Sequence, residues 1–287
     1  MSHNSNKLIA FNYFGGKFTW LDHLYRMFPK DFNHLVDVFA GSMSVSLNYK
    51  GKIVRTANEI NEDITNFFEV LRTDPEELVR LLELTPCSEL EYSRCWEISE
   101  DKMERARRYY VRLRMSFFGL GAQKESKSMH LTKTHVNADG GEVVSKLRNA
   151  VPKLMDVAKE IRNNFQIVNC DYSECIERFD FKDAFFYCDP PYSKRSRASF
   201  NDYKFEFTDE DHKRLAFQLH NIEGKAMVSG YDCSLMNELY SDFTKIKFPV
   251  KKNNIRSSDV QEVVWINYPI EKTASYVLNL FTNKSMA

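Results

Sequence analysis

The sequence contains no long apolar segment, which excludes a protein held in a membrane by spanning helices. No stretch of the 287-residue chain approaches the roughly 18 apolar residues that such a helix needs. The N-terminus, Met1 to Lys7, is polar, and it is not followed by the apolar core of a secretory signal. We therefore expect a cytoplasmic protein with no membrane partner.

Cysteine pairs and glycine-rich dinucleotide loops are also absent. None of the six cysteines forms a C-x-x-C pair and no histidine cluster accompanies them, so we expect reduced thiols and no metal site. The ten glycines contain no G-x-G-x-x-G pattern, which argues against a nicotinamide-dependent oxidoreductase.

The chain has no net charge, because 40 basic residues balance 40 acidic ones. A zero total argues weakly against a nucleic-acid partner. The charge is nevertheless uneven: residues 59–91 carry ten acidic and two basic side chains, residues 102–114 one acidic and six basic, and residues 245–256 none acidic and five basic. A neutral total can therefore hide a basic face, although solvated helix surfaces are an equal alternative.

Strands and helices alternate in the first and last parts of the chain. Helical patterns at 60–71, with Asn58 or Asn61 as the cap, and at 210–220 and 234–240 separate short apolar runs. These runs predict strands at 34–40, 52–57, 166–169, 183–188, 225–229, 243–250 and 261–268. Such alternation predicts an α/β domain with a parallel sheet, formed by residues 1–73 and 163–287.

The middle of the chain has a different pattern, which predicts an inserted and mainly helical domain at residues 74–162. Asp74-Pro75 begins one helix, since proline suits the first helical turn. Residues 102–117 form another, and the polar segment 119–141 reads as a loop or a small ribbon.

A glycine turn follows the first predicted strand, in the segment Asp37-Val38-Phe39-Ala40-Gly41-Ser42. Glycine at this point lets a ligand approach the backbone where a strand turns into its helix. Glu59 stands 22 residues after Asp37, a spacing typical of a carboxylate that binds ribose hydroxyls of a nucleoside cofactor. The alternative is an ordinary turn that binds nothing.

A second motif, Asp189-Pro190-Pro191-Tyr192, follows the predicted strand 183–188. The prolines fix φ and lack a backbone N–H, so the segment leaves the sheet as a rigid corner. The Asp189 carboxylate and the Pro190 carbonyl both accept hydrogen bonds, which suits an NH2 group with two donors. Tyr192 offers a flat face on which a base can stack. A rigid turn with a capping aspartate is the alternative.

A third motif, Asn12-Tyr13-Phe14-Gly15-Gly16-Lys17, lies near the N-terminus. The two glycines permit close backbone approach, and Lys17 supplies a positive charge for a cofactor carboxylate or a DNA phosphate. A plain turn is again the alternative.

The order of these motifs resembles the DNA adenine methylase (Dam-like) family, the alpha group of N6-adenine DNA methyltransferases. YFGGK comes first, DVFAGS second and DPPY follows an insertion. The resemblance extends from about Phe11 to Tyr268. It includes ANEINEDI at 57–64, CDYSE at 170–174, KFEFTDEDHKRLA at 204–216 and MVSGYD at 227–232.

The resemblance implies a class I S-adenosylmethionine-dependent methyltransferase fold, Rossmann-like, with a mostly parallel sheet of about seven strands whose last hairpin is antiparallel. The implied reaction moves a methyl group from S-adenosylmethionine to N6 of an adenine flipped out of double-stranded DNA, with residues 74–162 as the target-recognition domain. The implied catalytic residues are Asp189, Pro190, Pro191 and Tyr192. The implied cofactor-binding residues are Tyr13, Gly15, Gly16, Lys17, Asp37, Phe39, Gly41, Ser42, Glu59 and Asp171.

The insertion departs from the best-known members of that family. Where a segment resembling YNGLCRYN is expected, the chain has SFFGLGAQK at 116–124, so recognition of GATC is not carried over. Arginine can pair bidentately with guanine, and basic side chains clamp phosphates. We expect DNA contacts from Arg105, Arg108, Arg112, Arg114, Lys124, Lys194, Arg195 and Arg197, with surface solubility as the alternative.

Two other functions fit the same residues. N4-cytosine methylation uses the same acceptor geometry, and a DNA-binding regulator can keep the fold without catalysis. A cognate restriction endonuclease is a further candidate partner, and we expect a monomer or a weak dimer.

Overall fold

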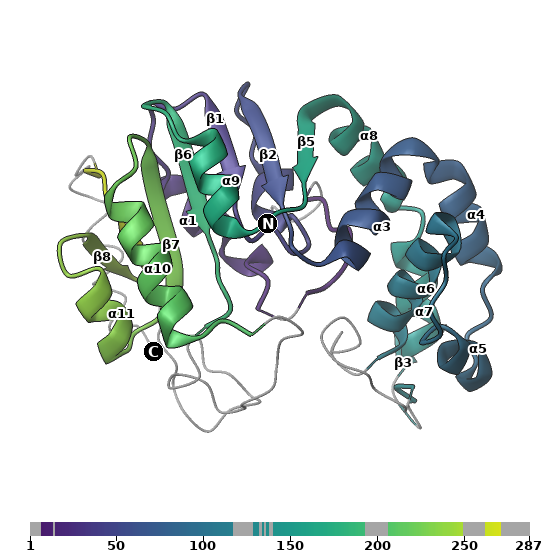
Figure 1. Cartoon of the computed structure of the whole chain (residues 1–287). Coiled ribbons are helices and arrows are strands. Elements are labelled where there is room, and N and C mark those ends of the chain that lie inside the picture. The colour runs from purple at the N-terminus through teal and green to yellow at the C-terminus, as the bar shows by residue number, and fades with distance from the viewer. Residues whose placement is uncertain are drawn as a thin grey trace, which may run out of the picture.

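Seven strands form one mixed sheet, and helices cover both of its faces (Figure 1). The computed structural model describes residues 7–13, 15–116, 129–131, 134, 136–137, 140–192, 206–248 and 262–270. The strands lie in the order β5-β2-β1-β6-β7-β9-β8. Their bounds are β1 His34–Asp37, β2 Val54–Asn58, β5 Phe165–Val168, β6 Ala184–Cys188, β7 Lys225–Tyr231, β8 Thr244–Lys247 and β9 Glu262–Ile266.

The sheet is parallel except at one end. Neighbours from β5 to β7 pair in parallel, whereas β9 runs antiparallel to both β7 and β8. The predicted class I methyltransferase architecture, with its antiparallel last hairpin, is confirmed.

Two sets of helices sandwich this sheet because successive strand residues point to opposite faces. Leu35 of β1 packs with helices α1 (Leu21–Met27) and α2 (Ser44–Asn48), together with a short 3-10 turn at Phe18–Trp20. Val36, the next residue, packs on the other face. The helices on that face are α9 Tyr172–Phe179, α10 Asp209–His220 and α11 Ser234–Leu239.

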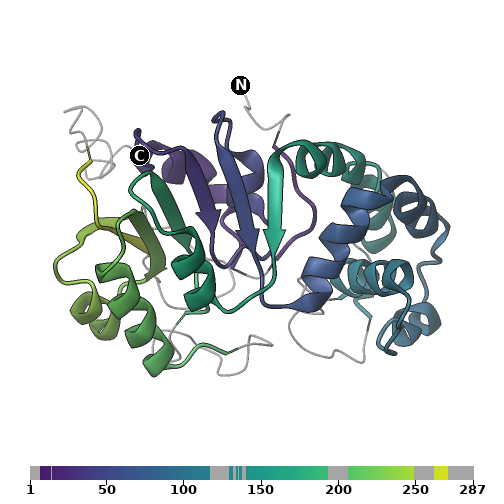
Figure 2. The same ribbon diagram turned by 45° about the horizontal axis from the view of Figure 1, so that its top comes forward.

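A block of helices lies beside the β5 edge of the sheet (Figures 1 and 2). This helical block comprises α3 Glu62–Thr73, α4 Pro75–Leu84, α5 Glu89–Arg94, α6 Lys102–Met115, α7 Glu142–Ala150 and α8 Leu154–Asn164. A short two-stranded ribbon, β3 Val136–Asn137 with β4 Gly140–Gly141, precedes α7. One hydrophobic cluster runs through the block and ends under β2 and β5.

The caps of these helices follow the sequence closely. Asn61, one of the two candidate caps, accepts a hydrogen bond from the backbone N–H of Asp63 at the start of α3. Asp74 caps α4 with Pro75 in its first turn, as predicted. The ring of Phe67 in α3 stacks on Tyr110 in α6, with centroids 5.6 Å apart. The helical packing therefore begins with α3, before residue 74.

Within the described part of the chain, no helix is both long and apolar enough to cross a membrane. Nor does any group of three or more His, Cys, Asp or Glu side chains among those residues form a metal-binding cluster. All six cysteines are free thiols.

Candidate active site

The candidate site lies at the edge of the sheet where the parallel strands end, the usual ligand position in open α/β sheets. Asp37 at the end of β1 pairs with Ala57 on one side and with Tyr187 on the other, so the segments after β1, β2 and β6 meet there. Figure 2 shows the arrowheads of β1, β2 and β5 pointing to this edge. A cavity of about 270 Å³ opens at this place.

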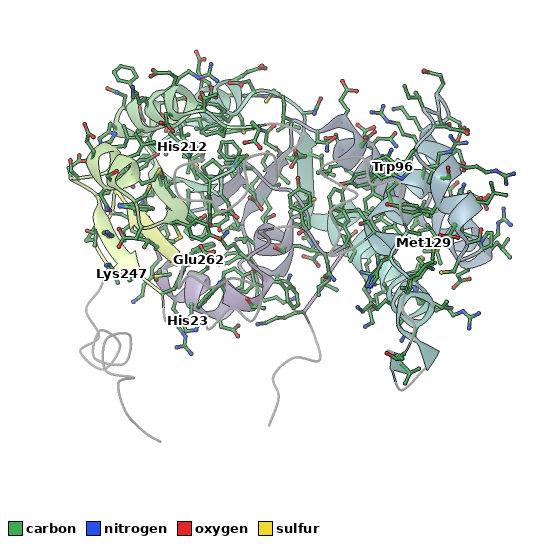
Figure 3. All side chains as sticks on the ribbon, turned by 90° about the horizontal axis from the view of Figure 1, so that it is seen from below. His23, Trp96, Met129, His212, Lys247 and Glu262 are labelled. Carbon is green, nitrogen blue, oxygen red and sulfur yellow. The ribbon has the colours of Figure 1, made fainter. Side chains whose placement is uncertain are left out.

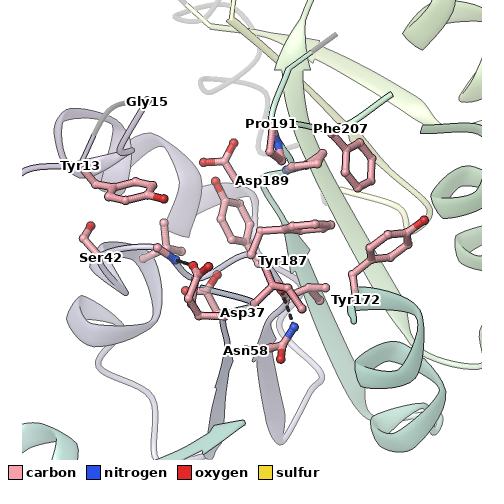
Figure 4. A pocket seen from close by; sticks show the side chains of 18 of the residues that line it. Tyr13, Gly15, Asp37, Ser42, Asn58, Tyr172, Tyr187, Asp189, Pro191 and Phe207 are labelled. Carbon is pink, nitrogen blue, oxygen red and sulfur yellow. Dashed lines mark hydrogen bonds between the residues drawn. The ribbon is translucent and has the colours of Figure 1, made fainter. Parts of the chain in front are cut away.

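The cavity brings the three sequence motifs together (Figure 4). All fourteen predicted catalytic and cofactor-binding residues line it. They are Tyr13, Gly15, Gly16, Lys17, Asp37, Phe39, Gly41, Ser42, Glu59, Asp171, Asp189, Pro190, Pro191 and Tyr192. The individual roles of these residues stay predictions. Because all three motifs line one cavity, the alternative of three unrelated turns that bind nothing is disfavoured.

The glycine turn after β1 needs glycine at one position. Gly41 has a φ of +51°, in the left-handed region that L side chains rarely adopt. A Cβ placed on it would lie 3.1 Å from the ring of Tyr13. The turn thus combines a backbone that favours glycine with a tyrosine packed directly over it.

Glu59 is held by the same turn. Its Oε2 accepts the backbone N–H of Gly41 at 2.8 Å, and its Oε1 accepts that of Asn61 at 2.9 Å. Burial raises the pKa of Glu59, although these backbone hydrogen bonds oppose the shift. The backbone of Ile60 is a third donor, and the carboxylate has four lone pairs, so one can still accept a hydroxyl from a ligand in the cavity.

Asp37 forms part of the cavity floor and is only 2% exposed. Ser46 donates a hydrogen bond to its Oδ2 at 2.7 Å. Burial raises the pKa of Asp37 to about 7, and the nearby charges of Asp189 and Glu59 add to this. The floor of the cavity is thus an acidic group balanced between its two protonation states near neutral pH.

The Asp189 carboxylate is bound by two side chains. The Lys17 ammonium donates to Oδ1 at 2.8 Å and to Oδ2 at 2.9 Å, and Ser229 donates to Oδ1 at 2.7 Å. Lys17 also donates to the carbonyl of Gly15 at 3.0 Å and is 2% exposed. We expected Lys17 to meet a cofactor carboxylate or a DNA phosphate. In the structure it pairs with Asp189, and its contact with a cofactor or with DNA stays a prediction.

Tyr192 is less open than the sequence suggested. Its side chain is 6% exposed, and the Lys17 ammonium lies 4.8 Å from its ring centroid. Its hydroxyl donates to Glu262 Oε2 at 2.9 Å, and its ring packs nearly perpendicular to Tyr231. One face of the expected stacking surface therefore already meets a cation.

The opposite end of the cavity is aromatic. Phe39 packs against Tyr172 and Phe207, with centroids 5.5 and 5.6 Å away. Asp171, at the rim, caps α9 by accepting the N–H of Ser173 and is also paired with Arg214 at 3.2 Å. Its carboxylate is thus already engaged within the protein.

Sequence reasoning missed three polar side chains of this site: Ser229, Glu262 and Arg214. Ser229 belongs to MVSGYD and Arg214 to KFEFTDEDHKRLA, segments whose resemblance was noted without a role for either side chain. Glu262 opens β9, and only the folded sheet brings it to Tyr192.

The α6 arginines do not present free guanidinium groups to DNA. Arg105 and Arg112 pair with Asp63, at 2.8 and 3.4 Å, and Arg108 pairs with Glu104 at 2.7 Å. Arg114 donates to the carbonyl of Lys146 at 2.6 Å. Asp63 of α3, Glu104 within α6 and the Lys146 carbonyl are partners that the sequence did not assign. DNA contacts by these four arginines stay predictions from the sequence.

Four other predicted DNA contacts, Lys124, Lys194, Arg195 and Arg197, lie outside the described residues. They stay predictions from the sequence.

Comparison with known proteins agrees with this geometry. A family model described as D12 class N6 adenine-specific DNA methyltransferase matches residues 13–255. The chain belongs to this family. It is therefore an enzyme that methylates adenine at N6 in DNA. Membership of this family argues against the two alternatives, N4-cytosine methylation and a DNA-binding regulator without catalysis.

Curated relatives carry compatible names. The chain is 27% identical over 279 residues to the type II methyltransferase M1.LlaDCHI of Lactococcus lactis subsp. cremoris, covering 88% of this chain and 93% of that protein. It is 23% identical over 274 residues to a DNA adenine methylase of Haemophilus influenzae, covering 88% and 91%. It is 24% identical to the modification methylase StsI of Streptococcus sanguinis, with 90% of this chain but only 42% of that protein covered.

Proposed function

We propose that the chain uses S-adenosylmethionine as methyl donor and acts on an adenine flipped out of double-stranded DNA. The observation that carries this proposal is that the glycine turn with Glu59 and the corner with Asp189 line one cavity. A donor bound along the turn would then lie beside an amine held at the corner.

The chemistry of the cavity fits this donor. The carboxyl oxygens of Asp37 and Glu59 can accept hydrogen bonds from an ammonium group and from sugar hydroxyls, and the aromatic end around Phe39 suits a purine ring. When bound, S-adenosylmethionine would supply an electrophilic methyl group on a sulfonium sulfur. Asp171 and Tyr13 would close the two ends of the same pocket.

Counting lone pairs indicates which Asp189 oxygen receives the target. Oδ1 accepts from both Lys17 and Ser229, which uses its two lone pairs, whereas Oδ2 accepts only from Lys17 among the described residues. Oδ2 and the Pro190 carbonyl would therefore accept the two N–H bonds of the adenine amine. Holding both N–H bonds turns the nitrogen lone pair toward the methyl group, so the residues act by positioning and electrostatics.

The amine cannot reach this corner while the adenine is paired, so the base must leave the duplex at a cost of a few kcal/mol. Stacking on Tyr192 would offset about 1–3 kcal/mol of that cost. Residues 74–162 are our proposed target-recognition domain. Lys124, Lys194, Arg195 and Arg197 are the proposed phosphate contacts.

We further propose a cytoplasmic enzyme, acting as a monomer or weak dimer. The type II name of the Lactococcus lactis relative supports a cognate restriction endonuclease as its counterpart in the cell.

Tritium transfer from labelled S-adenosylmethionine to unmethylated DNA tests the active site. Asp189→Ala should abolish transfer, while S-adenosylmethionine still binds in equilibrium titration because Glu59 and the glycine turn are intact. Persistent transfer in the variant would refute the assignment of Asp189. Nucleoside digestion of the product and mass analysis should give N6-methyladenine; N4-methylcytosine would overturn the proposed target.

A further inference from the structure

Two residues of the antiparallel strands meet the catalytic corner from one side. Tyr231 at the end of β7 pairs directly with Glu262 at the start of β9. Cross-strand neighbours lie close together and present adjacent side chains. Figure 3 shows Glu262 on the sheet side of the molecule, far from Trp96 and Met129 of the helical part.

Both members of this strand pair contact Tyr192. Glu262 Oε2 accepts the Tyr192 hydroxyl at 2.9 Å, and the ring of Tyr231 packs on that of Tyr192 with centroids 4.5 Å apart and planes inclined by 73°. The backbone of Glu262 is itself fixed, since its carbonyl accepts the N–H of Phe248 at 2.9 Å. The tyrosine is thus anchored at its ring and at its hydroxyl.

We propose that Glu262 is a positioning residue for methyl transfer, acting through the hydroxyl of Tyr192 to fix the ring on which the target base stacks. The inference rests on the proposed function, because it takes Tyr192 as the stacking surface. Glu262 does not touch the base or the methyl donor in this scheme.

The geometry gives this anchor a definite physical task. Rotation of a tyrosine about its Cα–Cβ bond swings the hydroxyl end of the ring through space, so the hydrogen bond to Glu262 on a sheet strand opposes that swing. The packed ring of Tyr231 restricts the remaining rotation of the ring about its own axis. A phenylalanine ring at position 192 would keep the stacking face and lose the anchor.

The anchor also acts on the cation beside the ring. Lys17 lies 4.8 Å from the Tyr192 centroid while it holds both oxygens of Asp189. Fixing the ring therefore also fixes one wall around the Lys17 ammonium. In this way Glu262 supports the acceptor Asp189 and the stacking surface together.

A double-mutant cycle on Glu262 and Tyr192 tests the inference. The variants are E262A, E262Q, Y192F and the E262A/Y192F pair, measured by single-turnover methyl transfer on a duplex carrying the methylation site mapped by sequencing. E262A and Y192F should each slow transfer about tenfold, since a hydrogen bond to a charged acceptor contributes about that factor. The E262A/Y192F double variant should be no slower than the slower of the two single variants, because both substitutions remove the same hydrogen bond. E262Q should recover most of the rate, because its amide oxygen still accepts the hydroxyl.

Glu238→Ala is the matched control, since Glu238 is an exposed glutamate on the neighbouring helix α11. It should leave the rate unchanged. Affinity for S-adenosylmethionine and the thermal midpoint should be equal in E262Q and the parent enzyme. A wild-type rate in E262A, or a pair about a hundredfold slower than the parent enzyme, would overturn the inference, because the two residues would then act independently.

A second measurement separates this inference from the proposed function. With 2-aminopurine at the target position, base flipping raises the fluorescence, and Y192A should change the emission of the flipped base. If Y192A leaves both emission and rate unchanged, the stacking role of Tyr192 fails. If Y192A changes them and E262A does not, only the role of Glu262 fails.

Discussion

The ammonium group of Lys17 lies between the two carboxylate oxygens of Asp189, at 2.8 and 2.9 Å, although 172 positions separate the residues in the chain. Burial alone would lower the pKa of Lys17, but the charges of Asp189 and Glu262 outweigh it and the pKa is raised. Lys17 thus stays charged across the physiological range. The N-terminal motif and the catalytic corner form one electrostatic unit.

Replacing Lys17 by Met keeps the aliphatic chain and removes this charge. We expect the free energy of unfolding to fall by about 2 kcal/mol, below the usual cost of breaking a fully buried pair, because Asp189 keeps Ser229 as a partner. Single-turnover transfer should fall by at least about tenfold, since Asp189 loses the partner that orients both oxygens. Urea denaturation and rate measurements check the two effects. A parent-like rate would show that the ion pair plays no part in the reaction.

The stability of the ligand-free enzyme should depend on the protonation of Asp37. Its pKa is about 7 in the folded protein, against an ordinary value of 3.8. The folded state therefore binds the extra proton, and its stabilising contribution is complete below about pH 4 and lost as the pH rises through 7. The loss should approach roughly 4 kcal/mol over that window.

Asp37→Asn keeps the shape of the side chain and removes this titration. The unfolding free energy of both proteins is measured by urea denaturation at pH 5 and at pH 8. Between these pH values the parent enzyme should lose more unfolding free energy than the variant, because only the parent ionises Asp37. Equal shifts in the two proteins would contradict the assignment to Asp37.

Gly41→Ala tests the turn over the cavity. A residue with a Cβ at a φ of +51° costs about 1–2 kcal/mol, and the added methyl would stand 3.1 Å from Tyr13. We expect lower stability and weaker S-adenosylmethionine binding, both measured by titration. Adding Tyr13→Ala should restore only the steric part, so the double variant should be more stable than the sum of the single effects predicts. Strict additivity would show that the ring does not restrict the turn.

Two arginine substitutions should distinguish an arginine that stabilises the fold from one that binds DNA phosphate. Arg112→Ala removes an ion pair to Asp63 and a contact with the Trp96 ring, so it should lower stability and leave the salt dependence of DNA binding unchanged. Arg195→Ala should lower the slope of log affinity against log salt by about 1. Fluorescence anisotropy over a salt series measures both slopes. The reverse pattern would place the DNA interface on α6.

The sequence predicted the parts of the fold that depend on local patterns. The sequence runs that form β1, β2 and β6 are short, contain residues that favour strands and are bounded by turn residues. The local sequence pattern therefore located these strands. The resemblance to the DNA adenine methylase family grouped Asp37, Glu59 and Asp189 in one site, and the parallel pairing of β1, β2 and β6 explains physically why they meet, since the carboxyl ends of these strands share an edge.

What the sequence could not give depends on contacts between distant segments. The ion pairs of Arg105 and Arg112 could not be predicted, because they form only when α3 packs on α6 and brings Asp63 against both side chains. Ser229 and Glu262 carry no local signal because strand order, which places β9 beside β7, creates their contacts. The pairing of Lys17 with Asp189 carried no local signal for the same reason.

The place of β9 between β7 and β8 has a consequence for biosynthesis. Among the described residues β9 is the last strand of the chain, yet it occupies an inner position, so β8 pairs with no described strand until β9 has been synthesised. Glu262 arrives in the same late segment. A nascent chain that ends before β9 therefore lacks both the strand that pairs with β8 and the carboxylate that accepts the Tyr192 hydroxyl.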